Sequence, residues 1–412
     1  MSDGDTGAVA RRAALHPRPP TLLAATALAM VAATSLGLAR FSYALLLPPM
    51  RADLQWSYLV AGAMNTVNAA GYLAGALLVP SVLARSDARR VVLAGCAAGA
   101  VLLAGHGLVL GDAALFILRL ATGTASAAAF VGGGLLAARL AADPRDAGRH
   151  RGGLVLGIYY GGTGLGIVVS ALLVPPLADR AAPHAWQGAW LGLALAAALA
   201  TLACAAGTRP SPAAVGAHGV RGRPFRWRDF AWGLASYFCF GLGYIGYMTF
   251  VVTLLREQGM GGGGIVAFYA LLGVAVVASS WLWAGLLQRH RGGVPAALLN
   301  ALLAVATVLP VASTHAVAVF ASGVLFGGVF LSVVASTTAL VRHNLPPAAW
   351  PAGIGAFTIV FAAGQIVGPT LVGWVADGPG GLVRGFFVSA GVLALGALLA
   401  LRQRPLVPAS AG

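Results

Sequence analysis

Two arginines, Arg40 and Arg119, stand in stretches of sequence that otherwise carry almost no charge. Arg40 lies within GLARFSY (residues 37–43) and Arg119 within RLATGTASA (residues 119–127). An arginine at the centre of a membrane span costs about 3 kcal/mol, so it generally faces a polar cavity or a partner. A planar guanidinium holds a carboxylate or phosphate through paired hydrogen bonds. These two residues therefore predict the binding of an anion.

The eleven acidic residues offer the two arginines no partner, because each falls in a loop, a tail or the end of an apolar stretch. Arg40 lies about six residues past the middle of its stretch and Arg119 about six before the middle of its own, which places each about 9 Å from the centre. If the stretches run in opposite directions, the two charges share a depth. We interpret them as a site for the acidic group of a small organic solute. The structural alternative is that Arg40 bonds helix-end carbonyls or extends toward Arg51 and Asp53.

Other polar side chains occur at helical spacings in the same apolar background. Asn65, Asn68 and Tyr72 follow i, i+3, i+7 and therefore share one helix face. Each could equally form hydrogen bonds between helices. The remaining candidates for contact with a solute are Tyr43, Tyr244, Tyr247 and Gln365.

Several kinds of chemistry are excluded by missing residues. The chain has no lysine, so all 26 basic residues are arginine, and neither a P-loop lysine nor a Schiff-base lysine is available. GMGGGG (residues 259–264) matches a dinucleotide-binding pattern, but it joins two apolar stretches without a preceding strand, and we interpret it as a loop. HExxH and paired CxxC motifs are absent. We expect no cofactor, no metal site and no enzymatic activity.

The elements that must position these residues are membrane-spanning helices. Hydrophobic residues make up 59% of the 412 residues and charged residues 9%, with a mean hydropathy of +0.85, far outside the range of soluble proteins. A helix of about 20 residues crosses about 30 Å of hydrocarbon, whereas a β-barrel needs short alternating segments. We predict an all-α membrane protein with twelve spans, at residues 21–47, 56–84, 91–111, 113–138, 152–178, 186–207, 229–255, 265–287, 294–312, 315–340, 351–376 and 383–401.

The distribution of arginine predicts the orientation of these spans. With the N-terminus inside, two arginines lie within spans, 20 face the cytoplasm and four face outward: Arg51, Arg180, Arg256 and Arg384. Because short cytoplasmic loops retain positive charge, we expect both termini in the cytoplasm. The net charge of +15 then reflects topology and attraction to the lipid bilayer. We expect no nucleic-acid binding, since no soluble domain is large enough to provide a basic face.

The chain shows signs of an internal repeat. The polar segment TRPSPAAVGAHGVRGRPFRWRD (residues 208–229) divides the spans six and six. GLARFSY has a counterpart 204 residues later in GLGYIGY (241–247), and Ala178-Asp179 has one 198 residues later in Ala376-Asp377. We predict two six-helix halves, 21–207 and 229–402, with a cytoplasmic linker at 208–228 and cytoplasmic tails at 1–20 and 403–412. Repeated halves are typical of carriers that work by alternating access.

Over nearly its whole length the chain resembles permeases of the major facilitator superfamily, and GLARFSY…LLPPM with GQIVGPTLVGWVAD (364–377) resembles a bacterial branch of it. The resemblance implies a monomeric secondary transporter in the inner membrane that moves a small organic solute, with an anion as the candidate. It also implies gating loops at Arg85, Arg89, Arg90, Arg289 and Arg291, although Ala84 and Gln288 replace the expected acidic residues. The alternative is a non-transporting sensor or a lipid-modifying enzyme on the same fold. Direction and coupling ion stay open.

Overall fold

The computed structural model describes residues 21–142, 152–179, 182–209 and 225–406. Within these ranges the chain forms helices and no strands, and twelve helical segments are long and apolar enough to cross a membrane, as predicted. The predicted tail at 1–20, most of the linker at 208–228 and residues 407–412 lie outside the described residues.

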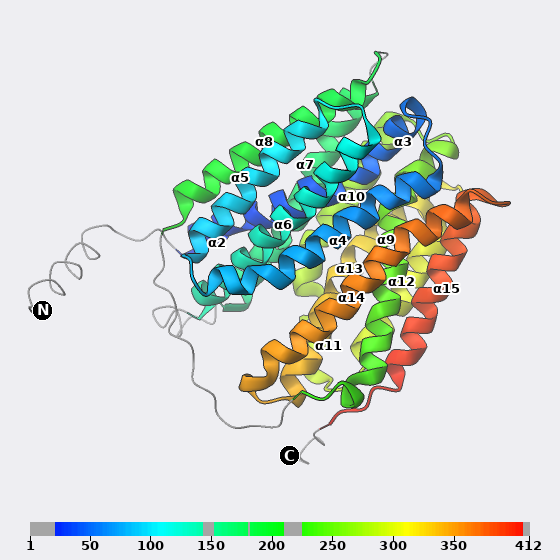
Figure 1. The fold of residues 1–412 in the computed structure, drawn as a ribbon. Coiled ribbons are helices and arrows are strands. Elements are labelled where there is room, and N and C mark those ends of the chain that lie inside the picture. The colour runs from blue at the N-terminus through cyan, green and yellow to red at the C-terminus, as the bar shows by residue number, and fades with distance from the viewer. Residues whose placement is uncertain (1–20, 143–151, 180–181, 210–224, 407–412) are drawn as a thin grey trace, which may run out of the picture.

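Each half of the chain contributes six of these segments (Figure 1). The first span combines α2 (Thr21–Ala32), η1 (Ala33–Phe41) and α3 (Tyr43–Asp53), and the first half continues with α4 (Tyr58–Leu83), α5 (Ala88–His106), α6 (Asp112–Ala141), α7 (Gly152–Ala178) and α8 (Ala185–Gly207). The second half consists of η3 (Trp227–Phe230), α9 (Ala231–Glu257), α10 (Gly262–Leu282), α11 (Ala284–Arg289), α12 (Val294–Ala312), α13 (Ala316–Asn344), η4 (Pro347–Ala349), α14 (Trp350–Ala376) and α15 (Gly381–Leu401).

Three helix boundaries correct the sequence prediction. The first span continues to Asp53 instead of ending at residue 47, because the helix runs through the proline pair at 48–49, which membrane helices tolerate. The third span occupies 88–106 rather than 91–111. The glycine-rich segment at 259–264 is only partly a loop, since Gly262 begins α10.

The spans that carry the repeated motifs are the two most deeply buried. In the first span 72% of the most apolar window is buried, and in the seventh 94%, compared with 28–61% in the other ten. A helix that is apolar on all sides is stable only where it is surrounded by protein or lipid. GLARFSY and GLGYIGY therefore lie on helices at the centre of the bundle.

The two halves meet along three helix pairs, and the internal repeat relates the pair α4–α14 to the pair α10–α7. Helix α4 packs against α14, α7 packs against α10, and α3 packs against α9. Helices α4 and α14 approach each other at one end of the bundle and diverge toward the other (Figure 1). We call the end with residues 54–57, 258–261 and 377–380 the loop end. The opposite end, where α2 begins and α15 ends, is the terminal end.

The crossing of α4 and α6 depends on two glycines. A Cβ atom on Gly123 would lie 2.1 Å from the carbonyl oxygen of Asn68, and one on Gly71 would lie 2.0 Å from that of Leu120. Their small size lets the backbones approach closely enough for Asn68 Nδ2 to donate to the Arg119 carbonyl oxygen at 3.0 Å. This contact fixes α6, and with it Arg119, against α4.

We predict that Gly123→Ala lowers the free energy of unfolding by about 1–3 kcal/mol, because the added methyl group overpacks this crossing. The measurement is the thermal midpoint of the purified protein in detergent. Gly391→Ala is the matched control, since its Cβ would meet no atom within 4 Å. Equal midpoints for the two variants would contradict the role assigned to Gly123.

Candidate functional site

Arg119, on α6, is enclosed by the first half and has no exposed surface. Its Nη1 donates to the carbonyl oxygen of Ala39 at 3.0 Å, and its Nη2 donates to Oδ1 of Asn65 at 3.4 Å. The guanidinium carbon lies 4.9 Å from the centre of the Tyr43 ring, within the range of a cation–π interaction. These partners offer partial negative charge, but none of them is an anion.

Arg40, in the π-helical segment η1, reaches from the first half to the second. Its Nη2 donates to Oε1 of Gln365 on α14, and its guanidinium carbon lies 5.6 Å from the centre of the Tyr72 ring. The residue is 4% exposed. π-Helical geometry inside α-helices is rare and is frequently found at functional sites. Arg40 is therefore buried at the interface between the halves and does not extend toward the loop end.

Both arginines retain donors that no protein atom uses. The Nε atoms of Arg40 and Arg119 are buried and donate to no acceptor among the described residues. Within the same residues, no carboxylate pairs with either guanidinium. Arg119 contacts the carbonyl group of Ala39, next to Arg40 in the chain, so the two charges lie in one layer of the bundle. Two neighbouring buried cations repel each other, and an anion bound beside them would relieve that repulsion.

The second half contributes aromatic rings next to Arg40. The ring centre of Tyr244 lies 5.6 Å from that of Phe361 and 5.9 Å from that of Phe330, and both pairs are stacked. Phe361 lies one helical turn before Gln365, the partner of Arg40. We call Tyr244, Phe330 and Phe361 the aromatic cluster. It provides a planar apolar surface beside the charged groups.

Tyr43 and its repeat counterpart Tyr247 make different contacts. The Tyr43 hydroxyl donates to the carbonyl oxygen of Ala61 at 2.8 Å, while its ring faces Arg119. Tyr247 shares a hydrogen bond of 2.7 Å with Ser322, and its ring centre lies 3.9 Å from that of Phe326. Ser322 and Phe326 flank the position on α13 that the 204-residue offset matches to Arg119. The second half therefore has a hydroxyl and a ring where the first half has a cation.

The two candidate asparagines differ in what they connect. Asn65 Nδ2 donates to Oγ1 of Thr249 on α9 at 2.7 Å, and its Oδ1 accepts from Arg119, so it links the halves. Asn68 donates a hydrogen bond to the Arg119 carbonyl oxygen within the first half. This is the hydrogen bond between helices that was the alternative to contact with a solute. A ligand on Arg119 would thus disturb a residue that bridges the halves.

Sequence reasoning missed the phenylalanines of the cluster and Trp190. Phe361 and Gln365 are four residues apart and share a helix face, a signal that could have identified Phe361. Trp190 lies 5.9 Å from the Arg119 guanidinium carbon and stacks on His106 at 4.5 Å. No spacing in the sequence indicates that Trp190 lies beside Arg119.

At the loop end, a set of polar contacts joins the halves. Asp377, after α14, accepts hydrogen bonds from the backbone nitrogens of Tyr58 at 2.7 Å and Leu59 at 2.9 Å, at the start of α4. Asp179, after α7, accepts from Arg256 at the end of α9. Asp179 and Asp377 are the pair related by the repeat, and each contacts the opposite half. We call these contacts the loop-end latch.

Glu257 extends the latch. The Tyr58 hydroxyl donates to its carboxylate, and Arg51 Nη1 lies 3.9 Å from the same oxygen. The Arg51 guanidinium carbon lies 3.7 Å from the centre of the Tyr58 ring. The latch therefore combines helix capping and ion pairing between the halves with a cation–π contact inside the first half.

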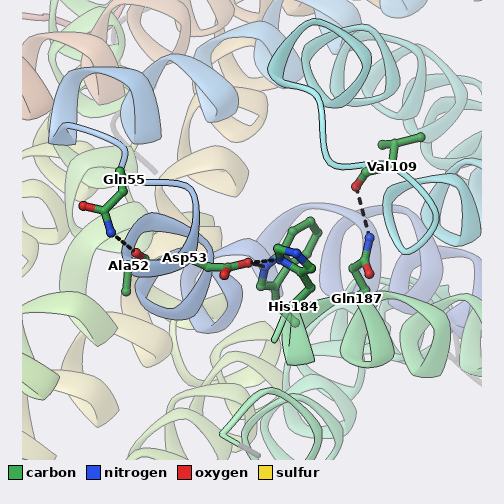
Figure 2. A network of polar contacts seen from close by, with 7 residues as sticks. Ala52, Asp53, Gln55, Val109, His184 and Gln187 are labelled. Carbon is green, nitrogen blue, oxygen red and sulfur yellow. Dashed lines mark hydrogen bonds and ion pairs between the residues drawn. The ribbon is translucent and has the colours of Figure 1, made fainter. Parts of the chain in front are cut away.

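A neighbouring network stays within the first half (Figure 2). His184 Nδ1 lies 2.5 Å from Oδ2 of Asp53, and Trp186 Nε1 donates to the same oxygen at 2.6 Å. Gln187 donates to the carbonyl oxygen of Val109 at 3.3 Å. These contacts tie α3, the start of α8 and the segment after α5 into one unit at the loop end.

The arginines predicted to form gating loops lie at the terminal end. Arg89 donates to the carbonyl oxygens of Ala205 at 2.7 Å and Thr208 at 3.1 Å, both in its own half. The other four are exposed: Arg85, Arg90, Arg289 and Arg291. None of the five bonds to the opposite half within the described ranges, and their gating role stays a prediction.

Comparison with known protein families assigns the chain to one of them. The family model described as "Uncharacterised MFS-type transporter YbfB" matches residues 32–401. The chain belongs to this family. It is accordingly a multi-pass membrane protein and a secondary transporter of the major facilitator superfamily, not an enzyme.

Solved structures of other transporters have the same fold as this chain. A nucleoside transporter, NupG, aligns with a TM-score of 0.67 and 15% identity over 93% of this chain and 100% of that one. A bacterial homologue of the human lysosomal transporter Spinster, in an inward-facing and occupied conformation, aligns with a TM-score of 0.72 and 13% identity over 92% and 95%. Among curated proteins there was no significant match.

Proposed function

We propose that this transporter carries a small organic anion that has a planar or apolar portion. One observation supports the proposal above all: Arg40 and Arg119 are buried without carboxylate partners, beside the aromatic cluster. The acidic group of the solute would accept hydrogen bonds from the unused guanidinium donors. The planar portion would pack against the rings of Tyr244 and Phe361.

The contacts of Arg40 suggest how binding is linked to movement. Arg40 belongs to the first half and its acceptor, Gln365, to the second. A carboxylate that takes over this donor would release Gln365 and remove one bond between the halves. In the proposed alternating-access cycle, ligand binding in this layer weakens the central contact while the loop-end latch holds one side closed.

The orientation of the cycle follows from the arginine distribution. We infer that the terminal end, rich in arginine, faces the cytoplasm of the bacterial inner membrane. The latch then closes the outer side. Both parts of the proposed site come from one chain, so a monomer suffices.

The proposal is tested by thermal unfolding of the detergent-purified protein with panels of aromatic carboxylates, their neutral amides, nucleosides and organic cations. A ligand at 100 times its dissociation constant stabilises the folded state by about 2.7 kcal/mol. We expect the carboxylates to raise the midpoint and the amides to leave it unchanged. Nucleosides are included because the aromatic cluster also suits a neutral planar solute and a structural neighbour is named a nucleoside transporter. Stabilisation by nucleosides or cations alone would contradict an anionic substrate. For any compound that binds, flux into vesicles then measures whether it is transported.

A further inference from the structure

A groove lies on the outer surface of the first half, between α5 and α6, away from the proposed substrate site. Its volume is about 940 Å³, near the upper limit for small-molecule sites. Helix α5 lines it with one face, at residues 90, 91, 94, 95, 98 and 102 together with the N-cap residue Asp87, and α6 lines it with another, at 117, 120, 121, 124, 125 and 128. Val82, Arg85 and Ser86, around the end of α4, complete it at the terminal end.

The groove is charged at one end and apolar along the rest. From Asp87 to Leu102 it follows α5 for 15 residues, which is about 22 Å. One leaflet is about 15 Å deep in its hydrocarbon part and about 20–22 Å deep with its headgroup region, half the thickness of a bilayer. Beyond the rim the lining consists of aliphatic residues, glycine and Thr124, whose hydroxyl is bonded to the Gly71 carbonyl oxygen at 3.1 Å. The groove therefore has the length and polarity of one lipid leaflet.

The two arginines at the rim are free to bind a ligand. Arg85 and Arg90 are exposed, and neither guanidinium has an acceptor among the residues that the structure describes. Arg89 between them is already used, since it bonds carbonyl groups at the end of α8. The one carboxylate of the rim, Asp87, caps α5 by accepting from the Arg90 backbone nitrogen at 3.0 Å. The rim therefore retains a net positive charge.

We propose that this groove binds one anionic phospholipid. Its phosphate interacts with Arg85 and Arg90, and an acyl chain runs along Ala94, Ala98 and Leu102. Basic pockets between membrane helices are known to select anionic headgroups, and arginine near the membrane surface contributes about 1 kcal/mol per residue. The proposal does not depend on the nature of the transported solute.

The test is native mass spectrometry of the full chain, titrated in detergent with dioleoylphosphatidylglycerol or dioleoylphosphatidylcholine. We expect a single-lipid complex that favours phosphatidylglycerol. Neutralising both rim arginines, Arg85→Gln with Arg90→Gln, should weaken phosphatidylglycerol binding by about 25-fold, or roughly fivefold per charge, and should weaken phosphatidylcholine binding less, because the choline group offsets the charge of its phosphate. Ala98→Phe, at an exposed position in the floor of the groove, should weaken binding of both lipids.

The matched control is Arg289→Gln with Arg291→Gln, which removes two exposed charges from the corresponding loop of the second half. This variant should bind phosphatidylglycerol as the wild type does. The proposal is overturned if the wild type does not distinguish the two lipids, if both double variants lose the same affinity, or if the Ala98→Phe protein binds normally. A two-chain complex that Ala98→Phe disrupts would instead show that a second copy occupies the groove.

Discussion

Arg40→Gln should abolish the response to acidic ligands while leaving the unliganded protein at least as stable as the wild type. Two charge-assisted hydrogen bonds to a carboxylate contribute about 3 kcal/mol, so the affinity should fall by roughly 100-fold. In the unliganded protein, the change removes a buried cation that lacks an anionic partner. The measurement is thermal unfolding across a ligand titration.

Two further variants separate charge from geometry in this prediction. Arg40→Lys keeps the charge but loses the planar fork, so it should retain only part of the affinity. Arg384→Gln removes an exposed charge at the loop end and should titrate as the wild type does. The anion hypothesis fails if Arg40→Gln lowers the unliganded midpoint and the ligand still raises it by the same amount. Arg40 would then be a structural residue.

The layer around Arg40 shows how far the sequence could predict the site. Arg40 and Arg119 stand out because charge is rare in apolar spans, and their equal depth follows from their distance to the span centres. In the structure Arg119 donates to the carbonyl oxygen of Ala39, the residue before Arg40, as expected for two side chains at similar depth. Gln365 was selected as a buried polar residue, yet its pairing with Arg40 depends on how α14 docks against the first span. Such pairings between halves leave no local signal in one sequence.

The loop-end latch was missed for a related reason. The repeat had already matched Asp179 with Asp377, but both were assigned only to the ends of spans. Their role depends on which helix start lies opposite each carboxylate, and that is a property of the packing between the halves. The π-helical turns at Arg40 also escaped prediction, because a π-helix has the same apolar composition as the α-helix around it.

Asp377→Ala should shift the protein from the conformation closed at the loop end toward one open there. Both carboxylate oxygens cap the first turn of α4, and their loss removes about 2 kcal/mol of cap and helix-dipole stabilisation that exists only while the halves are joined. The equilibrium should change by about 30-fold. Spin labels at Leu108→Cys and Gly261→Cys measure it, since these loop-end positions are open on opposite halves and the three native cysteines are buried. The distance between the two labels should have a shorter and a longer value, one for each conformation. The longer value, from the conformation open at the loop end, should become more populated in Asp377→Ala.

Asp53→Ala is the control that distinguishes loss of the latch from general weakening of the loop end. Asp53 also accepts two hydrogen bonds at this end, but from His184 and Trp186, which belong to its own half (Figure 2). Its removal should lower the thermal midpoint and leave the distance distribution unchanged. If Asp53→Ala and Asp377→Ala shift the distances equally, the loop end responds to any lost contact and the latch has no special part in closure. If only Asp377→Ala shifts them, closure depends on the repeat-related carboxylate that bridges the halves.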